Sequence, residues 1–336
     1  MTRFAAILLT LCLAASCRPP GTDSVTVEGF ALGTTYRVVA KGAAARNVPD
    51  LRGSLDSLFA AASASMSIFD TTSLLSRLNR NETDSLNASI AYCIGIAERV
   101  SRASEGRYDI TVLPLSEAWG FARSEAQPRP NVDSLLQYVG YEKIAVKEGR
   151  LVKADPGVRL DLNSLGKGAT VDMAARLLES FGVEEYLVEV GGEIFCRGTN
   201  PRGVEWRVAV DRPLDGNYTP GAEIQTVVSV SDAGLATSGN YRRFYLDESG
   251  RKIAHTIDPV TGMSRVTDLL SATVIAGSCA LADAYATMFM ALGLEEARRH
   301  AANLPDPVEA LFIYSDGNGD LRTWCTPGFA SHMEQR

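Results

Sequence analysis

The stretch Asp161-Leu-Asn-Ser-Leu-Gly-Lys-Gly168 stands where the sequence changes from a mainly helical to a mainly strand-like pattern. Directly after it, residues 169–181 have the apolar spacing of an amphipathic helix, which Gly182 ends. From residue 186 to 258 the chain consists of short apolar runs with alternating polar residues, as in half-buried strands. Because helices and strands are segregated along the chain instead of alternating, an α+β fold is predicted.

The same patterns place the other elements. Helices are expected at 47–65, 71–78, 88–104, 132–139, 169–181 and 281–292. Residues 25–39 are expected to form either a strand pair or one bent strand. Further strands are expected as hairpins of 144–146 with 151–153 and of 311–314 with 321–325, and at 186–190, 194–197, 206–211, 224–230, 243–246, 253–257 and 271–275. No linker divides residues 25–330, so a single domain is predicted over that range.

The N-terminus has the pattern of an export signal. A basic start at Arg3 precedes an apolar stretch, residues 4–15, that is too short to span a bilayer. The following Leu13-Ala-Ala-Ser-Cys17 resembles the cleavage site of a bacterial lipoprotein. This predicts a signal peptide at 1–16, lipid on Cys17, a tether at 17–24 and attachment to the bacterial cell membrane on its extracytoplasmic, periplasmic side. The alternative is a plain secretory signal that happens to contain a cysteine.

Composition limits the remaining possibilities. The 336 residues are 46% hydrophobic and 22% charged, which is ordinary for a globular protein with a large core. The net charge of −7, without clustered Lys or Arg, argues against a nucleic acid partner. The cysteines beyond the signal are widely spaced and contain no CxxC pair, so a metal cluster is not expected. They either form disulfides or are small buried side chains.

The opening stretch also has the features of an anion site. Asp161 stands at its head, Ser164 lies in the turn, and Gly166 and Gly168 flank Lys167 just before the expected helix. Backbone N–H groups at a helix start favour a bound phosphate, and a lysine adds positive charge. The spacing is not that of a P-loop. A tight structural turn between a strand and a helix is the alternative interpretation.

A second stretch, Ala282-Asp-Ala-Tyr-Ala-Thr287, places Asp283 and Thr287 on one face of an otherwise apolar helix. A buried carboxylate needs a partner. Mg²⁺ is one candidate, because it takes only one or two carboxylates and leaves its other positions to phosphates and water. A hydrogen bond from a neighbouring backbone amide to Asp283 is the alternative.

His255 is a third candidate. It lies in the segment Ala254-His-Thr-Ile-Asp258, which leads into a Pro-Val-Thr-Gly turn. A neighbouring Asp258 could tune the imidazole for proton transfer. A purely structural histidine is the alternative.

Eight ordered blocks of this sequence resemble the ApbE-type FAD:protein FMN transferases over nearly the whole mature length. The blocks are Ala31–Tyr36, Met66–Asp70 with Ser76–Asn79, Tyr108–Leu115 with Trp119–Phe121, Asp161–Asp172, Glu189–Glu193, Ala236–Tyr241, His255–Gly262 and Thr273–Thr287. The resemblance implies an ApbE-like fold of largely antiparallel sheets with packed helices.

The resemblance also implies a reaction and a set of site residues. The FMN moiety of FAD would pass to a Thr or Ser hydroxyl of a flavoprotein subunit in a membrane redox complex, with release of AMP. Asp283, Thr287 and the carbonyl of Ser164 would bind Mg²⁺. The FAD site would be lined by Leu32, Phe69, Tyr108, Asp109, Asp161, Lys167 and Ile257.

The choice of catalytic base remains open between His255 and Asp283. If His255 is the base, the rate should fall below about pH 6 as the imidazole protonates. Two other functions remain possible: an FAD pyrophosphatase that releases FMN and AMP, and a non-catalytic flavin-binding lipoprotein.

Overall fold

The computed structural model describes residues 24–122, 130–215, 217, 219, 221–241 and 243–334. The predicted signal peptide, the lipidation site Cys17 and the predicted tether up to residue 23 lie outside the described residues, whereas Ser24 already belongs to a strand. Within the described residues, no helix is both long and apolar enough to cross a membrane.

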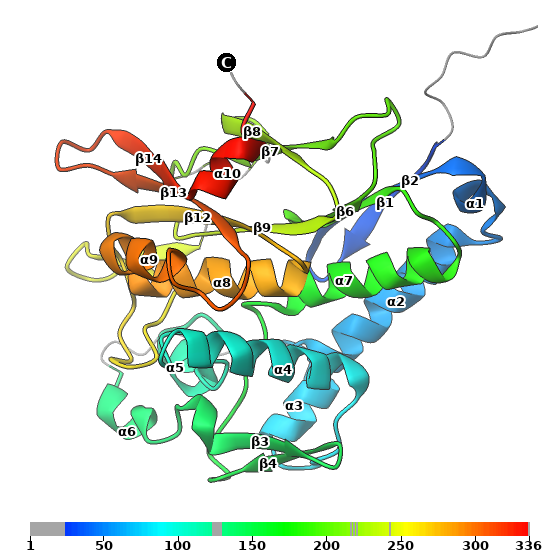
Figure 1. Ribbon diagram of the computed structural model, residues 1–336. Coiled ribbons are helices and arrows are strands. Elements are labelled where there is room, and N and C mark those ends of the chain that lie inside the picture. Colours follow the sequence, from blue (N-terminus) through cyan, green and yellow to red (C-terminus); the bar gives the residue numbers. More distant parts are fainter. Residues whose placement is uncertain are drawn as a thin grey trace, which may run out of the picture.

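An antiparallel sheet of eight strands forms the centre of the fold (Figure 1). In spatial order its strands are β1 (Ser24–Ala31), β2 (Thr34–Lys41), β5 (Tyr186–Val190), β6 (Glu193–Arg197), β9 (Ala233–Gly239), β12 (Leu269–Ala276), β13 (Glu309–Ser315) and β14 (Leu321–Cys325). Three hairpins are separate from it: β3 (Ile144–Lys147) with β4 (Arg150–Lys153), β7 (Trp206–Asp211) with β8 (Ile224–Val230), and β10 (Phe244–Leu246) with β11 (Lys252–Ala254).

The helices vary widely in length. They are α1 (Gly42–Asn47), α2 (Leu51–Met66), α3 (Leu74–Asn79), α4 (Ala88–Ala103), α5 (Leu113–Ala118), α6 (Val132–Leu136), α7 (Gly166–Ser180), α8 (Cys279–Leu292), α9 (Leu294–Ala301) and α10 (Pro327–His332), with a 3₁₀ turn at Tyr141–Lys143.

Helices and strands are layered (Figure 1). Helices α7 and α8 lie along one face of the sheet, with α4 and α2 beyond them, while the β7–β8 hairpin and α10 lie on the opposite side. Strand β12 is therefore buried on both faces. Its Ala272 and Val274 pack towards the helices, whereas Ile275 packs with β7, β8 and Phe329 of α10. This double burial explains why the strand is apolar along almost its whole length.

The start of α8 is held tightly against its neighbours. A Cβ atom on Gly168 of α7 would lie 2.5 Å from the carbonyl oxygen of Cys279, and one on Gly234 of β9 would lie 2.4 Å from the Cys279 nitrogen. Asp172 accepts hydrogen bonds from the backbone N–H groups of Cys279 (2.8 Å) and Ala280 (3.0 Å). The two glycines and this capping carboxylate fix α7, α8 and β9 relative to one another.

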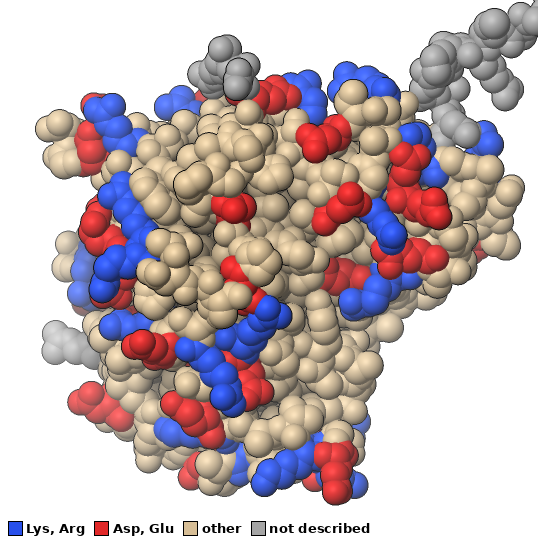
Figure 2. Space-filling model, in the orientation of Figure 1, with Lys and Arg blue, Asp and Glu red and all other residues tan. Residues whose placement is uncertain are grey.

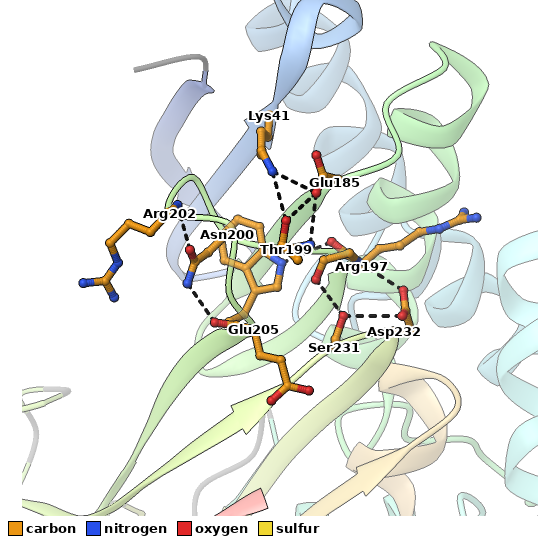
Figure 3. A network of polar contacts seen from close by, with 11 residues as sticks. Lys41, Glu185, Arg197, Thr199, Asn200, Arg202, Glu205, Ser231 and Asp232 are labelled. Carbon is orange, nitrogen blue, oxygen red and sulfur yellow. Dashed lines mark hydrogen bonds and ion pairs between the residues drawn. The ribbon is translucent and has the colours of Figure 1, made fainter. Parts of the chain in front are cut away.

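A polar network ties the connection between β6 and β7 to the sheet (Figure 3). Lys41 of β2 donates to Glu185 and to Thr199, both at 2.9 Å. Asn200 accepts from the N–H of Arg202 at 2.8 Å and donates to the carbonyl of residue 205 at 2.7 Å. These contacts are local and hold the connecting loop in place. Elsewhere on the face shown in Figure 2, Lys and Arg side chains are interspersed with Asp and Glu.

The predicted α+β class, with largely antiparallel sheets and packed helices, is confirmed, but several elements differ from the sequence prediction. Helix α7 begins at Gly166, so Lys167 lies in its first turn and not before it. The strand expected at 253–257 ends at Ala254, and the central strand β9 was not predicted at all. Helices α1, α5, α9 and α10 were also missed.

All four described cysteines are free: three are buried and Cys325 is partly exposed. The structure thus favours small buried side chains over disulfides for this part of the chain.

Candidate functional site

A cavity of about 800 Å³ opens beside the start of α7. Its wall includes the proposed metal ligands, the two base candidates and the proposed FAD-site residues, although they come from distant parts of the chain. These residues are Leu32, Phe69, Tyr108, Asp109, Asp161, Ser164, Lys167, His255, Ile257, Asp283 and Thr287. The fold therefore brings the candidate anion site, the candidate metal ligands and the candidate base to one place.

The candidate anion site is the first turn of α7. The Ser164 hydroxyl lies 2.8 Å from the hydroxyl of Tyr108, which fixes the turn before the helix. Lys167 forms an ion pair with Glu193, the first residue of β6. Desolvation acts to lower the pKa of Lys167, but the charges of Glu193 and Asp283 outweigh it and raise that pKa above its ordinary value.

Asp283 lies behind this turn and is only 4% exposed. One of its carboxylate oxygens accepts a hydrogen bond from the N–H of Gly168 at 3.1 Å, so the backbone contact considered from the sequence is present. Burial, followed by the charge of Glu193, raises the pKa of the Asp283 carboxyl to about 8. A single amide therefore does not compensate for the burial of this charge.

The donor set at Asp283 fits Mg²⁺ bound together with a phosphate. Thr287 lies one helical turn further along α8, and its hydroxyl is 3.1 Å from that of Ser238. Among the described residues, no group of three or more His, Cys, Asp or Glu side chains could enclose a metal ion. A site with few protein ligands suits Mg²⁺, which commonly keeps positions for substrate phosphates and water.

Two further carboxylates, Asp109 and Asp161, line the same cavity. Asp109 accepts from both the N–H and the hydroxyl of Thr111 at 2.7 Å, and burial raises the pKa of Asp109 to about 6. Asp161 accepts from the N–H of Asn163 at 2.9 Å, and burial raises the pKa of Asp161 as well. Phe69, 53% exposed, adds an apolar ring to the same cavity. This part of the wall can hold a flat, partly polar ring system.

His255 is held by the backbone and not by Asp258. Its Nδ1 atom lies 3.2 Å from the carbonyl oxygen of Arg243, which can only accept a hydrogen bond. In the neutral ring, Nδ1 therefore carries the proton and Nε2 is left as the acceptor. Desolvation, followed by the charge of Arg243, lowers the pKa of His255 to about 4. Asp258 instead pairs with Arg107 at 3.2 Å, so the proposed tuning of His255 by Asp258 was wrong.

Sequence reasoning overlooked three charged residues of the described cavity wall, which are Arg107, Glu193 and Arg243. Glu193 is 3% exposed and contacts Lys167, and Arg243 positions His255. Glu193 ends the Glu189-Val-Gly-Gly-Glu193 block, so the motif was noticed, but no role was assigned to its last residue. Arg243 lies outside every block, and the sequence offers no signal for it.

Comparison with known proteins gives a consistent result. The family model described as the ApbE family matches residues 32–312. The FAD:protein FMN transferase of Escherichia coli is 32% identical over 324 residues, covering 93% of this chain and 90% of the relative. The FAD:protein FMN transferase of Haemophilus influenzae is 34% identical over 306 residues, covering 87% of each chain.

Solved structures agree with these relatives. The flavin transferase ApbE from Vibrio cholerae superimposes with a TM-score of 0.79 at 30% identity, covering 92% of this chain and 99% of that one. The apo flavinyl transferase ApbE of Pseudomonas stutzeri gives a TM-score of 0.78 at 28% identity, with coverages of 92% and 96%. On the family match, the sequence identity and the shared fold together, the chain belongs to the ApbE family.

Proposed function

We propose that this protein is an FAD:protein FMN transferase. A Thr or Ser hydroxyl of an acceptor flavoprotein attacks the FMN-side phosphorus of FAD. A phosphoester bond forms, the pyrophosphate P–O bond breaks, and AMP leaves. The observation that carries the proposal is the single cavity in which Lys167, Asp283 and Thr287 meet Asp109, Asp161 and Phe69.

The residues at the α7 start and on α8 would hold the pyrophosphate and its cation. Asp283, Thr287 and the carbonyl of Ser164 would hold Mg²⁺, which when bound neutralises charge on the pyrophosphate and on the leaving phosphate. Lys167 would contact the phosphate oxygens from the first turn of α7, where the helix N-terminus adds positive potential.

His255 is the better placed of the two base candidates. Its Nε2 atom is left as an acceptor, and its lowered pKa keeps the ring neutral at physiological pH. Asp283 already accepts the Gly168 N–H and is the candidate cation ligand, which reduces its availability for a proton. We therefore assign removal of the hydroxyl proton to His255.

The direct test is co-expression with an acceptor flavoprotein subunit, followed by mass spectrometry of the acceptor. We expect an adduct with the mass of FMN on a Thr or Ser, and in a reaction of the purified proteins we expect no adduct when FAD or Mg²⁺ is omitted. Release of FMN and AMP without an acceptor, at the rate of transfer, would instead indicate an FAD pyrophosphatase. Flavin binding with neither product would indicate a non-catalytic binding protein.

The variant Asp283→Asn tests the cation site. Asparagine keeps an oxygen for the Gly168 N–H but removes the negative charge, so the fold should survive while Mg²⁺-dependent turnover is lost. Calorimetric Mg²⁺ binding and thermal unfolding should be measured on the same sample. Turnover like that of the parent protein would contradict the metal assignment, and loss of folding would assign Asp283 a structural role.

We further propose that one domain, residues 25–330, carries this activity at the membrane surface. Lipid on Cys17 and the tether to residue 24 would hold it on the extracytoplasmic, periplasmic side of the bacterial cell membrane. The acceptor would be a subunit of a membrane redox complex that exposes its Thr or Ser in the same space. The support for the anchor is the Leu13-to-Cys17 pattern described above. Stable attachment needs more than one acyl chain, since a single chain binds membranes only marginally.

A further inference from the structure

Glu193 is a buried carboxylate with an unused oxygen. It follows the Gly191-Gly192 turn between β5 and β6, in which both glycines have positive φ angles (61° and 98°). Positive φ angles at both central residues are the geometry of a two-residue hairpin turn, which here joins β5 to β6 and pairs Glu193 with Val190. One oxygen of Glu193 contacts Lys167, whereas Oε2 is buried and has no hydrogen-bond partner within the described residues. Such an orphaned acceptor in a cavity wall points to a ligand.

The charges around Glu193 do not cancel. The described cavity wall contains four acidic side chains (Asp109, Asp161, Glu193, Asp283) and three basic ones (Arg107, Lys167, Arg243), so its formal charge is one unit negative. Without Glu193 this charge would be zero, and Lys167 would be free to contact a phosphate. Glu193 therefore opposes the entry of an anion that arrives alone.

We infer that Glu193 makes binding of the anionic pyrophosphate depend on a divalent cation. This rests on the proposed function and adds a role for a residue of the same cavity. A cation held by Asp283 would supply positive charge that offsets the negative charge of Glu193, so Glu193 would no longer oppose binding of the pyrophosphate. Without the cation, Glu193 repels the pyrophosphate, and its ion pair with Lys167 keeps that ammonium group from the phosphate oxygens. FAD should thus enter with its metal ion.

The test measures coupling and not catalysis. FAD binding to the whole protein is followed by titration calorimetry with and without Mg²⁺ at about pH 9, which is above the pKa of about 8 of the Asp283 carboxyl. Chromatography of each sample checks that FAD stays intact. In the parent protein, Mg²⁺ should strengthen FAD binding at least tenfold. In Glu193→Gln this ratio should shrink about tenfold, or about 1.4 kcal/mol of coupling. The loss should come mainly from tighter FAD binding in the absence of Mg²⁺.

Reciprocity supplies an internal check, because FAD must change the affinity for Mg²⁺ by the same factor. The conservative variant Glu193→Asp keeps the charge and should keep most of the ratio. Glu189→Gln is the matched control: Glu189 accepts from the N–H of Gly192 at 2.7 Å in the same turn but does not line the cavity. In Glu189→Gln, Mg²⁺ should strengthen FAD binding by the same factor as in the parent protein.

The outcomes separate this inference from the proposed function. The role of Glu193 is overturned if Mg²⁺ strengthens FAD binding to Glu193→Gln as much as it does in the parent protein. It is also overturned if Glu189→Gln loses as much of the Mg²⁺ effect as Glu193→Gln does. Either result leaves the transferase assignment intact. If the parent protein binds FAD equally well with and without Mg²⁺, this inference fails, while the transferase assignment still depends on the FMN adduct. If the parent protein binds no FAD, the proposed function fails and this inference fails with it. Should Glu193→Gln not fold, the retained or lost ratio in Glu193→Asp decides.

Discussion

At the scale of single residues, His255 shows how a backbone carbonyl can prepare a side chain for chemistry. The contact of Nδ1 with the Arg243 carbonyl selects one tautomer, and the surrounding protein disfavours the charged ring. A neutral base is thereby available without a carboxylate partner. The same environment changes the expected pH response, since the ring protonates near pH 4 and not near pH 6.

Replacing His255 by alanine should separate catalysis from binding. We expect nearly unchanged FAD affinity and a transfer rate lower by about 10²- to 10⁴-fold, the usual contribution of a general base. Single-turnover rates and FAD titrations on the same preparation measure the two effects. Full transfer rate with weak FAD binding would assign His255 to flavin packing and leave Asp283 as the base candidate.

Nuclear magnetic resonance titration of the imidazole should place the pKa of His255 near 4, with His255→Gln used to assign its signals. Because an unfolded histidine has a pKa near 6.5, the unfolded chain binds the extra proton between these values. The contribution of His255 to stability is therefore complete above about pH 6.5 and declines as the pH falls towards 4. A titration midpoint near 6.5 would contradict this environment.

At the scale of elements, the crossing of α7 and α8 determines the site. The Gly168 amide and the Asp283 carboxylate are bonded across it, so the anion site and the cation site form one unit. A side chain on Gly168 would meet backbone atoms of Cys279, which cannot swing aside. Close packing of backbone against backbone is thus a requirement of the chemistry as well as of the fold.

The variant Gly168→Ala should lower the free energy of unfolding by about 1–3 kcal/mol, the usual cost of overpacking. Gly166→Ala is the matched control in the same helical turn. A Cβ at residue 166 meets nothing within 4 Å, so that variant should be neutral or stabilised by up to about 1 kcal/mol. Denaturant unfolding measures both. Equal stability of the two variants would show that α7 and α8 separate easily.

Packing against α8 explains why one element could not be predicted from the sequence. Long amphipathic helices such as α4 and alternating strands such as β7 are recognised by the spacing of their apolar residues, and both were predicted. Strand β9, in contrast, has small residues such as Gly234 because α8 lies directly against it. Small side chains carry neither strand propensity nor a periodic signal, so tertiary packing alone makes this segment a strand.

The site was predicted unevenly for a related reason. Lys167, Asp283 and Thr287 occur in short motifs whose spacing has a chemical meaning, and the structure places all three in one cavity. The contact of Glu193 with Lys167 and that of Arg243 with His255 depend on how strands pair and where loops lie in the folded protein. Such contacts between distant segments leave no trace in local spacing.

At the scale of the whole molecule, the anchor can be tested independently of catalysis. The variant Cys17→Ser should move the protein from the membrane fraction to the soluble extracytoplasmic fraction, because the lipid attachment site is lost. Activity in extracts should persist, because the substitution leaves every proposed catalytic and ligand-binding residue unchanged. Fractionation with immunodetection measures the distribution. Unchanged membrane attachment would exclude the lipoprotein interpretation.

The order of strands in the central sheet has a consequence for timing. Strand β2 pairs with β5, which begins only at Tyr186, and β9 pairs with β12, which begins at Leu269. Closing such long loops costs conformational entropy before the strand contacts form, so chains with this topology fold slowly. The central strands and α8 cannot assemble until the ribosome has released almost the entire polypeptide. If the chain is exported as proposed, this late assembly would keep it largely unfolded during synthesis, which is the state that passage through a secretion channel requires.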